Sequence, residues 1–377
     1  MAAAPAGDQE LIDTAISQAG LDDFGGDSFR EGLAQLTSSL RTEGRLNAAG
    51  ESVIYPRLVS HLVTRLQVED WYARHPETDD SPVLSPLIGL SLPRTGSTAL
   101  SFLLAQDPDV RYLHIWESGQ PVPPPSTVTG HDPRVSPLYV EKIGTKDHVP
   151  SDAEGPMECL DLMAMDFRTM IYEAFARIPS YARWLNDEDL TSTYAYERRV
   201  LKLLQFGETP RPWRLKSPAH MLWVGDLLSV FPDARFVMTP TDVLASVCDV
   251  YADIGATFSD DVDRGYIGEV NFEQWSLGID RVLSLRDGPA NERFYDIDFR
   301  AMQADPIGEV RSLYEWLGEP VSDAFEERMR RWWEINSENR EPSTHSSLAD
   351  YGLDADDVRS RFAEYVTRAK EWTAHRS

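Results

Sequence analysis

Residues 87–100, LIGLSLPRTGSTAL, combine an apolar run with a polar turn that carries a cation. The apolar run at 87–92 is typical of a strand buried in a parallel sheet, and Pro93 ends it. Gly96 allows a tight turn. Ser97 or Thr98 can then cap a helix rich in leucine. The spacing therefore predicts a strand, a turn and a helix in direct succession.

Such a succession directs several backbone N–H groups and a helix N-terminus at one point, which favours an anion. Arg94 adds a positive charge there. We therefore expect a phosphate- or sulfate-binding turn formed by Arg94, Thr95, Gly96, Ser97 and Thr98. The alternative is an ordinary connection between a strand and a helix.

The turn does not match the loop of nucleoside triphosphatases, G-x-x-x-x-G-K-[ST]. No lysine follows Gly96, and Gly89 lies too far upstream to be the first glycine of that motif.

Composition narrows the class of protein. The 377 residues, 42% of them hydrophobic, suffice for a large core. No apolar run approaches the roughly 18 residues of a membrane span, and the N-terminus lacks a secretory pattern. Two cysteines are too few for a disulfide framework, so we expect a cytoplasmic protein. The net charge of −26 argues against nucleic acid and anionic membranes as partners.

Strand-like and helix-like segments alternate after residue 84. This alternation predicts an α/β fold with a central parallel sheet, whose ligands bind beyond the carboxyl ends of the strands. We expect a helical extension at 1–80, an α/β domain at 81–330, and a C-terminal loop and helix at 331–377 that cover the site. Within them we expect helices in 8–75, 156–175, 194–206, 221–228, from 243 onward and 310–317, and strands at 87–92, 213–215, 235–239 and 294–297.

Several motifs in order resemble the bacterial branch of the sulfotransferase family. They are GLSLPRTGST at 89–98, WE at 116–117 with PVPPP at 121–125, PMEC at 156–159, WRLKSPAH at 213–220, FPDARF at 231–236 and the segment 305–318. The resemblance implies a P-loop-like three-layer α/β sandwich that binds 3′-phosphoadenosine 5′-phosphosulfate (PAPS) and releases adenosine 3′,5′-bisphosphate. Arg94 to Thr98 would then hold the 5′-phosphosulfate, with Arg94 where many relatives carry lysine.

The resemblance also implies catalytic roles for residues outside the turn. It places Lys216 and His220 near the sulfuryl group. The acceptor must lose a proton, and the resemblance favours Glu117 as the base, with His114 second. Each of these residues also has a simpler alternative role. Glu117 can form an ion pair or cap a helix, His114 can pack against neighbouring side chains, His220 can belong to the core, and Lys216 can be exposed to solvent.

One part of the family pattern is missing. Relatives carry His-Arg-Asp-Pro after the third strand, with a serine eight residues after the arginine, and this Arg and Ser bind the 3′-phosphate. Here Thr241 and Asp249 occupy these positions. A lost charge-assisted contact costs about 1.5–3 kcal/mol. Another cation could compensate, and the sequence offers Arg183, Arg198, Arg199, Arg340 and Arg359.

Three functional hypotheses follow. The first is sulfuryl transfer from PAPS to a hydroxyl or amine of a small apolar or phenolic acceptor. The second is a lyase, dehydratase or isomerase on the same fold that uses the loop for a substrate anion, and the third is a binding protein without catalysis. Aromatic and methionine side chains at 157–172 would line an acceptor pocket or belong to the core, and His345 lies in a candidate lid. We expect no bound metal ion, and the sequence indicates no particular oligomeric state.

Overall fold

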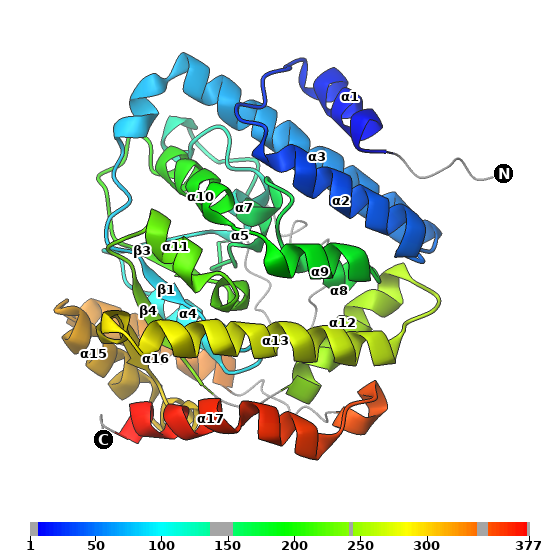
Figure 1. Ribbon diagram of the computed structural model, residues 1–377. Helices are drawn as coiled ribbons and strands as arrows, with labels where there is room; N and C mark the ends of the chain where they lie inside the picture. The colour runs from blue at the N-terminus through cyan, green and yellow to red at the C-terminus, as the bar shows by residue number, and fades with distance from the viewer. Residues whose placement is uncertain (1–6, 136–153, 241–243, 338–345, 375–377) are drawn as a thin grey trace.

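A computed structural model describes residues 7–135, 154–240, 244–337 and 346–374. It contains a five-stranded, all-parallel sheet in the order β2-β3-β1-β4-β5. Three of these strands, β1, β3 and β4, are labelled in Figure 1. Ile88 of the central strand pairs with Leu215 on one side and Phe236 on the other. The strands are β1 (Leu87–Gly89), β2 (Arg111–Tyr112), β3 (Trp213–Lys216), β4 (Arg235–Met238) and β5 (Phe294–Asp296).

The predicted α/β class is confirmed, and four of the five strands lie where the sequence places them. β2 was not predicted, because two residues give no periodic signal. β1 ends at Gly89 rather than at residue 92. The N–H of Leu90 still donates to the carbonyl of Val237, and the chain then leaves the sheet to form the turn.

The helical region predicted at 8–75 is three helices. They are α1 (Asp8–Ala19), α2 (Ser28–Glu43) and α3 (Ala48–Arg74). Gly20 ends α1 in the left-handed conformation that glycine adopts most easily. These helices pack on one another at the upper edge of Figure 1, and their buried side chains join the larger apolar core, which also contains residues of the sheet.

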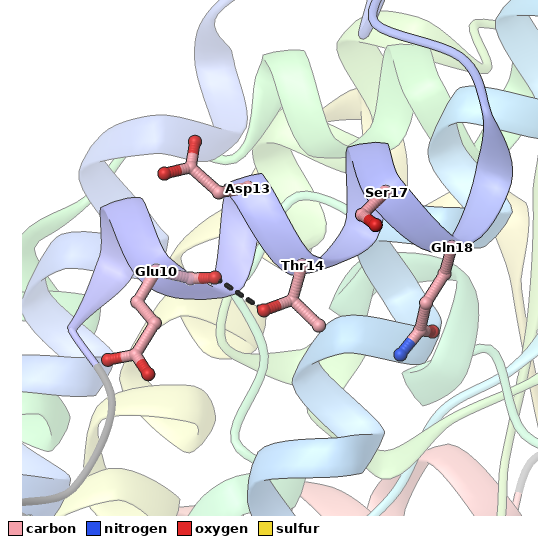
Figure 2. A pocket seen from close by; sticks show the side chains of 5 residues that line it. All are labelled: Glu10, Asp13, Thr14, Ser17 and Gln18. Carbon is pink, nitrogen blue, oxygen red and sulfur yellow. Dashed lines mark hydrogen bonds between the residues drawn. The ribbon is translucent and has the colours of Figure 1, made fainter.

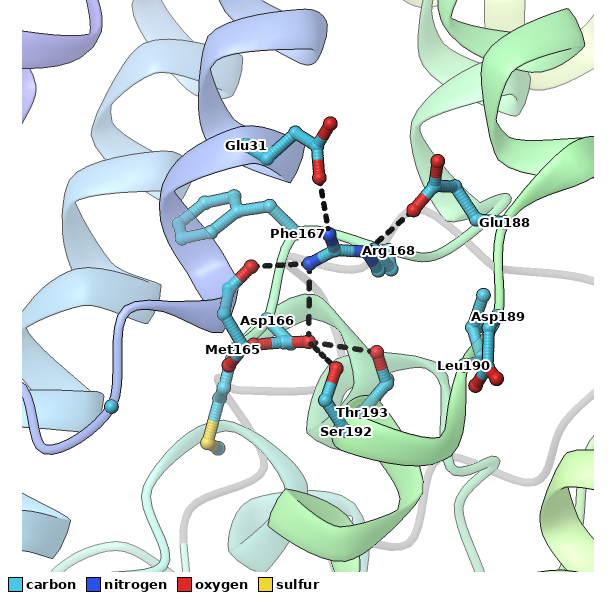
Figure 3. Close-up of polar contacts among 12 residues, drawn as sticks. Glu31, Met165, Asp166, Phe167, Arg168, Glu188, Asp189, Leu190, Ser192 and Thr193 are labelled. Carbon is cyan, nitrogen blue, oxygen red and sulfur yellow. Dashed lines mark hydrogen bonds and ion pairs between the residues drawn. The ribbon is translucent and has the colours of Figure 1, made fainter.

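The single helix predicted for 156–175 is wrong. The structure has two short helices, α7 (Leu160–Ala164) and α8 (Ile171–Phe175), and Phe167 between them has a φ of 54°. The buried Asp166 carboxylate accepts a hydrogen bond from Thr193 at 2.8 Å (Figure 3). It also accepts a hydrogen bond from Ser28 and pairs with Arg65. This network holds the chain out of helical geometry, so tertiary contacts outweigh local helix propensity.

The remaining helices surround the sheet. They include α13, which the sequence analysis did not predict and which crosses the molecule in Figure 1. No helix in the described ranges is both long and apolar enough to traverse a bilayer. The remaining helices are α4 (Ser97–Leu104), α5 (Ile115–Gly119), α9 (Pro179–Asp187), α10 (Thr191–Leu204), α11 (Val224–Val230), α12 (Leu244–Phe258), α13 (Arg264–Arg286), α14 (Phe299–Ala304), α15 (Pro306–Leu317), α16 (Asp323–Ser337) and α17 (Ala355–Ala374). The 3₁₀ turns are η1 (Pro76–Asp80), η2 (Pro125–Thr127), η3 (Pro218–Met221), η4 (Pro289–Arg293) and η5 (Leu348–Tyr351).

Two apolar clusters bury the faces of the sheet. The larger one joins α1–α3, α7–α13 and α17, and the smaller one joins α4, α15 and α16. Beside the smaller cluster, Trp332 of α16 stacks on Phe102 of α4, with ring centroids 5.2 Å apart, so α16 covers α4. In the larger one η5 and α17 pack on α13. The C-terminal segment is therefore part of the packed fold.

Candidate active site

The turn after β1 lies where the carboxyl ends of β1, β3 and β4 meet. Three buried hydroxyl groups fix it. Thr95 Oγ1 lies 2.7 Å from Thr239 Oγ1, and the Thr239 N–H donates to Ser91 Oγ at 2.7 Å. Because Thr239 directly follows β4, these bonds anchor the turn to the neighbouring strand and hold its backbone in one position.

The backbone of the turn adopts a conformation that most sequences avoid. Arg94 and Gly96 have φ values of 69° and 88°. A Cβ on Gly96 would also lie 3.0 Å from the Phe299 ring. A positive φ costs free energy in any residue other than glycine, and such strain is found at functional sites. In this turn Arg94 is the strained residue.

The Arg94 side chain is partly buried, and burial lowers the pKa of its guanidinium. No described residue forms a hydrogen bond or ion pair with this group. A partly desolvated arginine with free donors beside a helix N-terminus is suited to an anion. The predicted anion-binding turn requires a cation, and Arg94 is available for that role.

Lys216, the last residue of β3, reaches the same place. Its Nζ lies 3.4 Å from Thr98 Oγ1 and 2.5 Å from Glu158 Oε1. Gly89 makes room for it, since a Cβ there would lie 3.1 Å from the Lys216 Cγ. The interpretation of Lys216 as a solvated lysine is wrong, because its side chain is only 10% exposed.

Glu158 was not among the candidate catalytic residues. Its carboxylate is 28% exposed, and its partner Lys216 touches the turn. Its only sequence signal is its position in the PMEC motif. This motif lies about 60 residues after the turn, so the sequence does not reveal that the two are close in the fold. The structure thus brings a partly exposed carboxylate to the anion site.

Glu117 has the helix-capping and ion-paired role that the sequence left open. One oxygen pairs with the buried Arg111, and the other accepts the His114 backbone N–H at 3.0 Å, at the start of α5. The residue is 1% exposed. Both oxygens are therefore used within the fold, and Glu117 stays a predicted base without a geometric argument in its favour.

His114 starts α5 and packs between the rings of Tyr112 and Trp116. Its Nδ1 lies 2.7 Å from the Glu154 carbonyl oxygen. Burial lowers the pKa of this imidazole. The arrangement agrees with the packing role that the sequence also allowed.

His220 is fully buried in η3, which follows β3 directly. Its Nδ1 lies 3.1 Å from the Tyr194 hydroxyl, and burial lowers its pKa to about 3. The ring is therefore neutral at physiological pH. It adjoins Cys159 and Glu197, although the sequence spacing of these three residues suggested no metal cluster.

Asp249 faces the C-terminal segment. It accepts hydrogen bonds from the Tyr351 hydroxyl (2.7 Å) and the Ser346 N–H (3.0 Å). Thr241 lies outside the described residues, as do Arg340 and His345. The compensating arginines suggested by the sequence are engaged elsewhere: Arg198 with the Val230 carbonyl, Arg199 with Glu69 and Arg359 with Asp356; Arg183 lies on α9.

Two hollows are lined by residues that the structure describes. One lies between α4 and the sheet, directly behind the turn, and Ser97, Lys216 and Thr239 are among its lining residues. The other is a surface hollow on α1, lined by Glu10, Asp13 and polar side chains (Figure 2). Its acidic lining does not suit an anion. The apolar side chains of 157–172 are mostly buried core.

Fold and site together define an α/β protein with Arg94, Lys216 and a helix N-terminus at the carboxyl edge of its parallel sheet. The model of the sulfotransferase family matches residues 86–323. The structure is similar to sulfotransferase STF9 from Mycobacterium avium (33% identity, TM-score 0.88, 97% of each chain covered). It is also similar to sulfotransferase STF1 from Mycobacterium tuberculosis H37Rv (31% identity, TM-score 0.82, 96% of this chain and 99% of that chain covered).

The chain therefore belongs to the sulfotransferase family, a family of transferase enzymes. The predicted family is confirmed. A comparison with curated protein sequences gave no match.

Proposed function

We propose that the protein transfers a sulfuryl group from PAPS to a hydroxyl or amine of a small acceptor. The observation that carries this proposal is the position of Lys216, which contacts Thr98 in the turn and Glu158 beside it. A cation at the donor site and a carboxylate next to that cation are the two groups that sulfuryl transfer needs.

The chemistry assigns each group one task. An oxygen or nitrogen of the acceptor forms a bond to sulfur while the bond from sulfur to the phosphate oxygen breaks. Glu158 takes the acceptor proton. The negative charge left on the nucleotide phosphate is stabilised by Arg94, Lys216 and the N–H groups at the start of α4.

The ion pair between Lys216 and Glu158 fits this sequence of events. The Glu158 carboxylate occupies a position beside Lys216 that an anionic donor also favours. We infer that donor binding draws Lys216 toward the phosphosulfate and leaves Glu158 available to the acceptor. Charge-assisted bonds of this kind contribute about 1.5–3 kcal/mol each, so the exchange is feasible.

An apolar or phenolic acceptor is part of the proposal. Tyr251 of α12 lies within electrostatic range of Glu158: burial raises the Tyr251 pKa most, and the Glu158 charge is the smallest of the other contributions that raise it. An aromatic side chain in this region would favour acceptors that stack or pack against it.

The second candidate is an enzyme of the same fold that uses the turn for a substrate anion in a lyase, dehydratase or isomerase reaction. Asp249 supports it, because the family motif puts this residue at the position of the serine that binds the 3′-phosphate, and its carboxylate accepts a hydrogen bond from Tyr351 instead. The intact turn favours sulfuryl transfer more strongly, since Arg94, Lys216 and Glu158 all remain.

Incubation with PAPS and a panel of phenols and apolar alcohols tests the proposal. We expect a sulfated product by mass spectrometry and equimolar adenosine 3′,5′-bisphosphate, both strongly reduced in Glu158→Gln and Lys216→Met. If no acceptor is sulfated and the folded protein does not bind the bisphosphate at millimolar concentration, sulfuryl transfer is rejected in favour of the second candidate.

A further inference from the structure

Three chemically distinctive side chains meet in the core just after the carboxyl end of β3. The Cys159 sulfur, a carboxylate oxygen of Glu197 and a ring nitrogen of His220 all lie within 4.8 Å of one another. They come from the residue before α7, from α10 and from η3, so only the fold brings them together. Each residue is 0% exposed.

The cluster contains polar atoms that the described protein does not satisfy. His220 Nε2 has no hydrogen-bond partner among the described residues, and the Glu197 carboxyl group has none there beyond the neighbouring Cys159 thiol. Buried polar atoms of native proteins almost always have partners. An unpartnered ring nitrogen beside a carboxyl group and a thiol points to a ligand.

The orientation of His220 supports this interpretation. Its Nδ1 lies 3.1 Å from the Tyr194 hydroxyl, which leaves Nε2 as the ring nitrogen available to a metal. Metal-binding histidines typically donate their second ring N–H to a neighbouring oxygen, and this bond fixes the ring. Tyr194 provides that oxygen.

We propose that Cys159, Glu197 and His220 form a buried binding site for one divalent transition-metal ion, with zinc as the best match. Thiolate, imidazole and carboxylate are the three protein ligands that zinc accepts together. One thiolate and one carboxylate also balance the two positive charges of the ion, so the buried site would be neutral. This proposal is independent of the proposed sulfuryl transfer.

The site would tie together the segments that carry the catalytic pair. Cys159 follows Glu158 directly, and its backbone N–H donates to the Lys216 carbonyl at 3.1 Å. His220 lies four residues after Lys216. A metal at this point would link both segments to α10, and full burial makes its role structural. Glu158 and Lys216 would be positioned through it.

Metal analysis of the full chain tests the proposal. We expect about one zinc per chain after purification without chelators, and uptake of one equivalent of zinc or cobalt by chelator-treated protein. The cobalt form should show a thiolate-to-cobalt charge-transfer absorption. Cys159→Ser should abolish that absorption, whereas Cys248→Ser, which changes the other buried cysteine, should keep it.

Failure to retain or take up stoichiometric metal in the folded wild-type protein would overturn the proposal and leave a hydrogen-bonded triad of neutral groups. An absorption that survives Cys159→Ser would overturn it as well. Glu197→Gln, which preserves size, provides a second variant if Cys159→Ser does not fold. In competition with a chromophoric chelator we expect its zinc affinity to fall at least about tenfold, and an unchanged affinity contradicts the assignment.

Discussion

The two connections that leave the central strands β1 and β4 differ in what they offer a nucleotide. After β1, the turn presents Arg94, a helix N-terminus and the nearby Lys216. Along α12, after β4, Asp249 presents a carboxylate that binds Tyr351 and Ser346. The first connection carries groups that suit an anion, and the second anchors the C-terminal segment. If the protein binds a donor nucleotide as we propose, this difference predicts that the two ends of the nucleotide are bound with unequal strength.

The largest expected effect concerns the base at the first connection. Glu158→Gln should lower kcat about 10²–10⁴-fold, because general-base catalysis contributes that much, while the KM for the donor changes little. Steady-state kinetics with saturating acceptor measures it. A variant with wild-type kcat would remove Glu158 from the mechanism.

Lys216→Met should weaken binding of the donor and of its nucleotide product about 10–100-fold. The variant loses one charge-assisted bond, worth about 1.5–3 kcal/mol, at the turn. Calorimetric titration measures the change. Arg211, an arginine that pairs with Glu208 away from the turn, is a matched control, and Arg211→Met should bind normally.

Glu117→Gln distinguishes the two roles that the sequence allowed for Glu117. Since its carboxylate pairs with Arg111 and caps α5, the substitution should lower the free energy of unfolding by about 1–3 kcal/mol. The activity of the folded fraction should stay within a few-fold of wild type. A loss of kcat as large as that of Glu158→Gln, with normal stability, would restore Glu117 as the base.

The smallest expected effect concerns the second connection. Asp249→Asn removes one negative charge and should raise the affinity for adenosine 3′,5′-bisphosphate several-fold, with no change for adenosine 5′-monophosphate. The variant should also melt slightly earlier, because an amide cannot accept both hydrogen bonds as well. An equal change for both nucleotides would show that Asp249 does not face the 3′-phosphate.

The sequence predicted the parts of the fold that rest on local patterns. The buried runs around Ile88, Leu215 and Phe236 identify the strands, and the order of motifs identifies the family. The break at Phe167 was not predictable, because it depends on Asp166 binding side chains from three distant segments. Helix periodicity contains no such information.

The candidate site was predictable to a similar extent. The turn itself is local, so residues 94–98 could be found from their own types and spacing. The pairing of Lys216 with Glu158 and the meeting of Cys159, Glu197 and His220 depend on contacts between segments 20 to 60 residues apart along the chain. One sequence without structure does not provide these contacts, and the family resemblance favours Glu117 rather than Glu158 as the base.

The central claim is that the 5′ end of a donor nucleotide is bound more strongly than its 3′-phosphate. The most direct test compares two nucleotides on the wild-type protein. Calorimetric titration should give dissociation constants for adenosine 3′,5′-bisphosphate and adenosine 5′-monophosphate that differ by no more than about tenfold, or about 1.4 kcal/mol. Lys216→Met should weaken both equally. A preference for the bisphosphate of a hundredfold or more, or no binding of either nucleotide at millimolar concentration, would contradict the account.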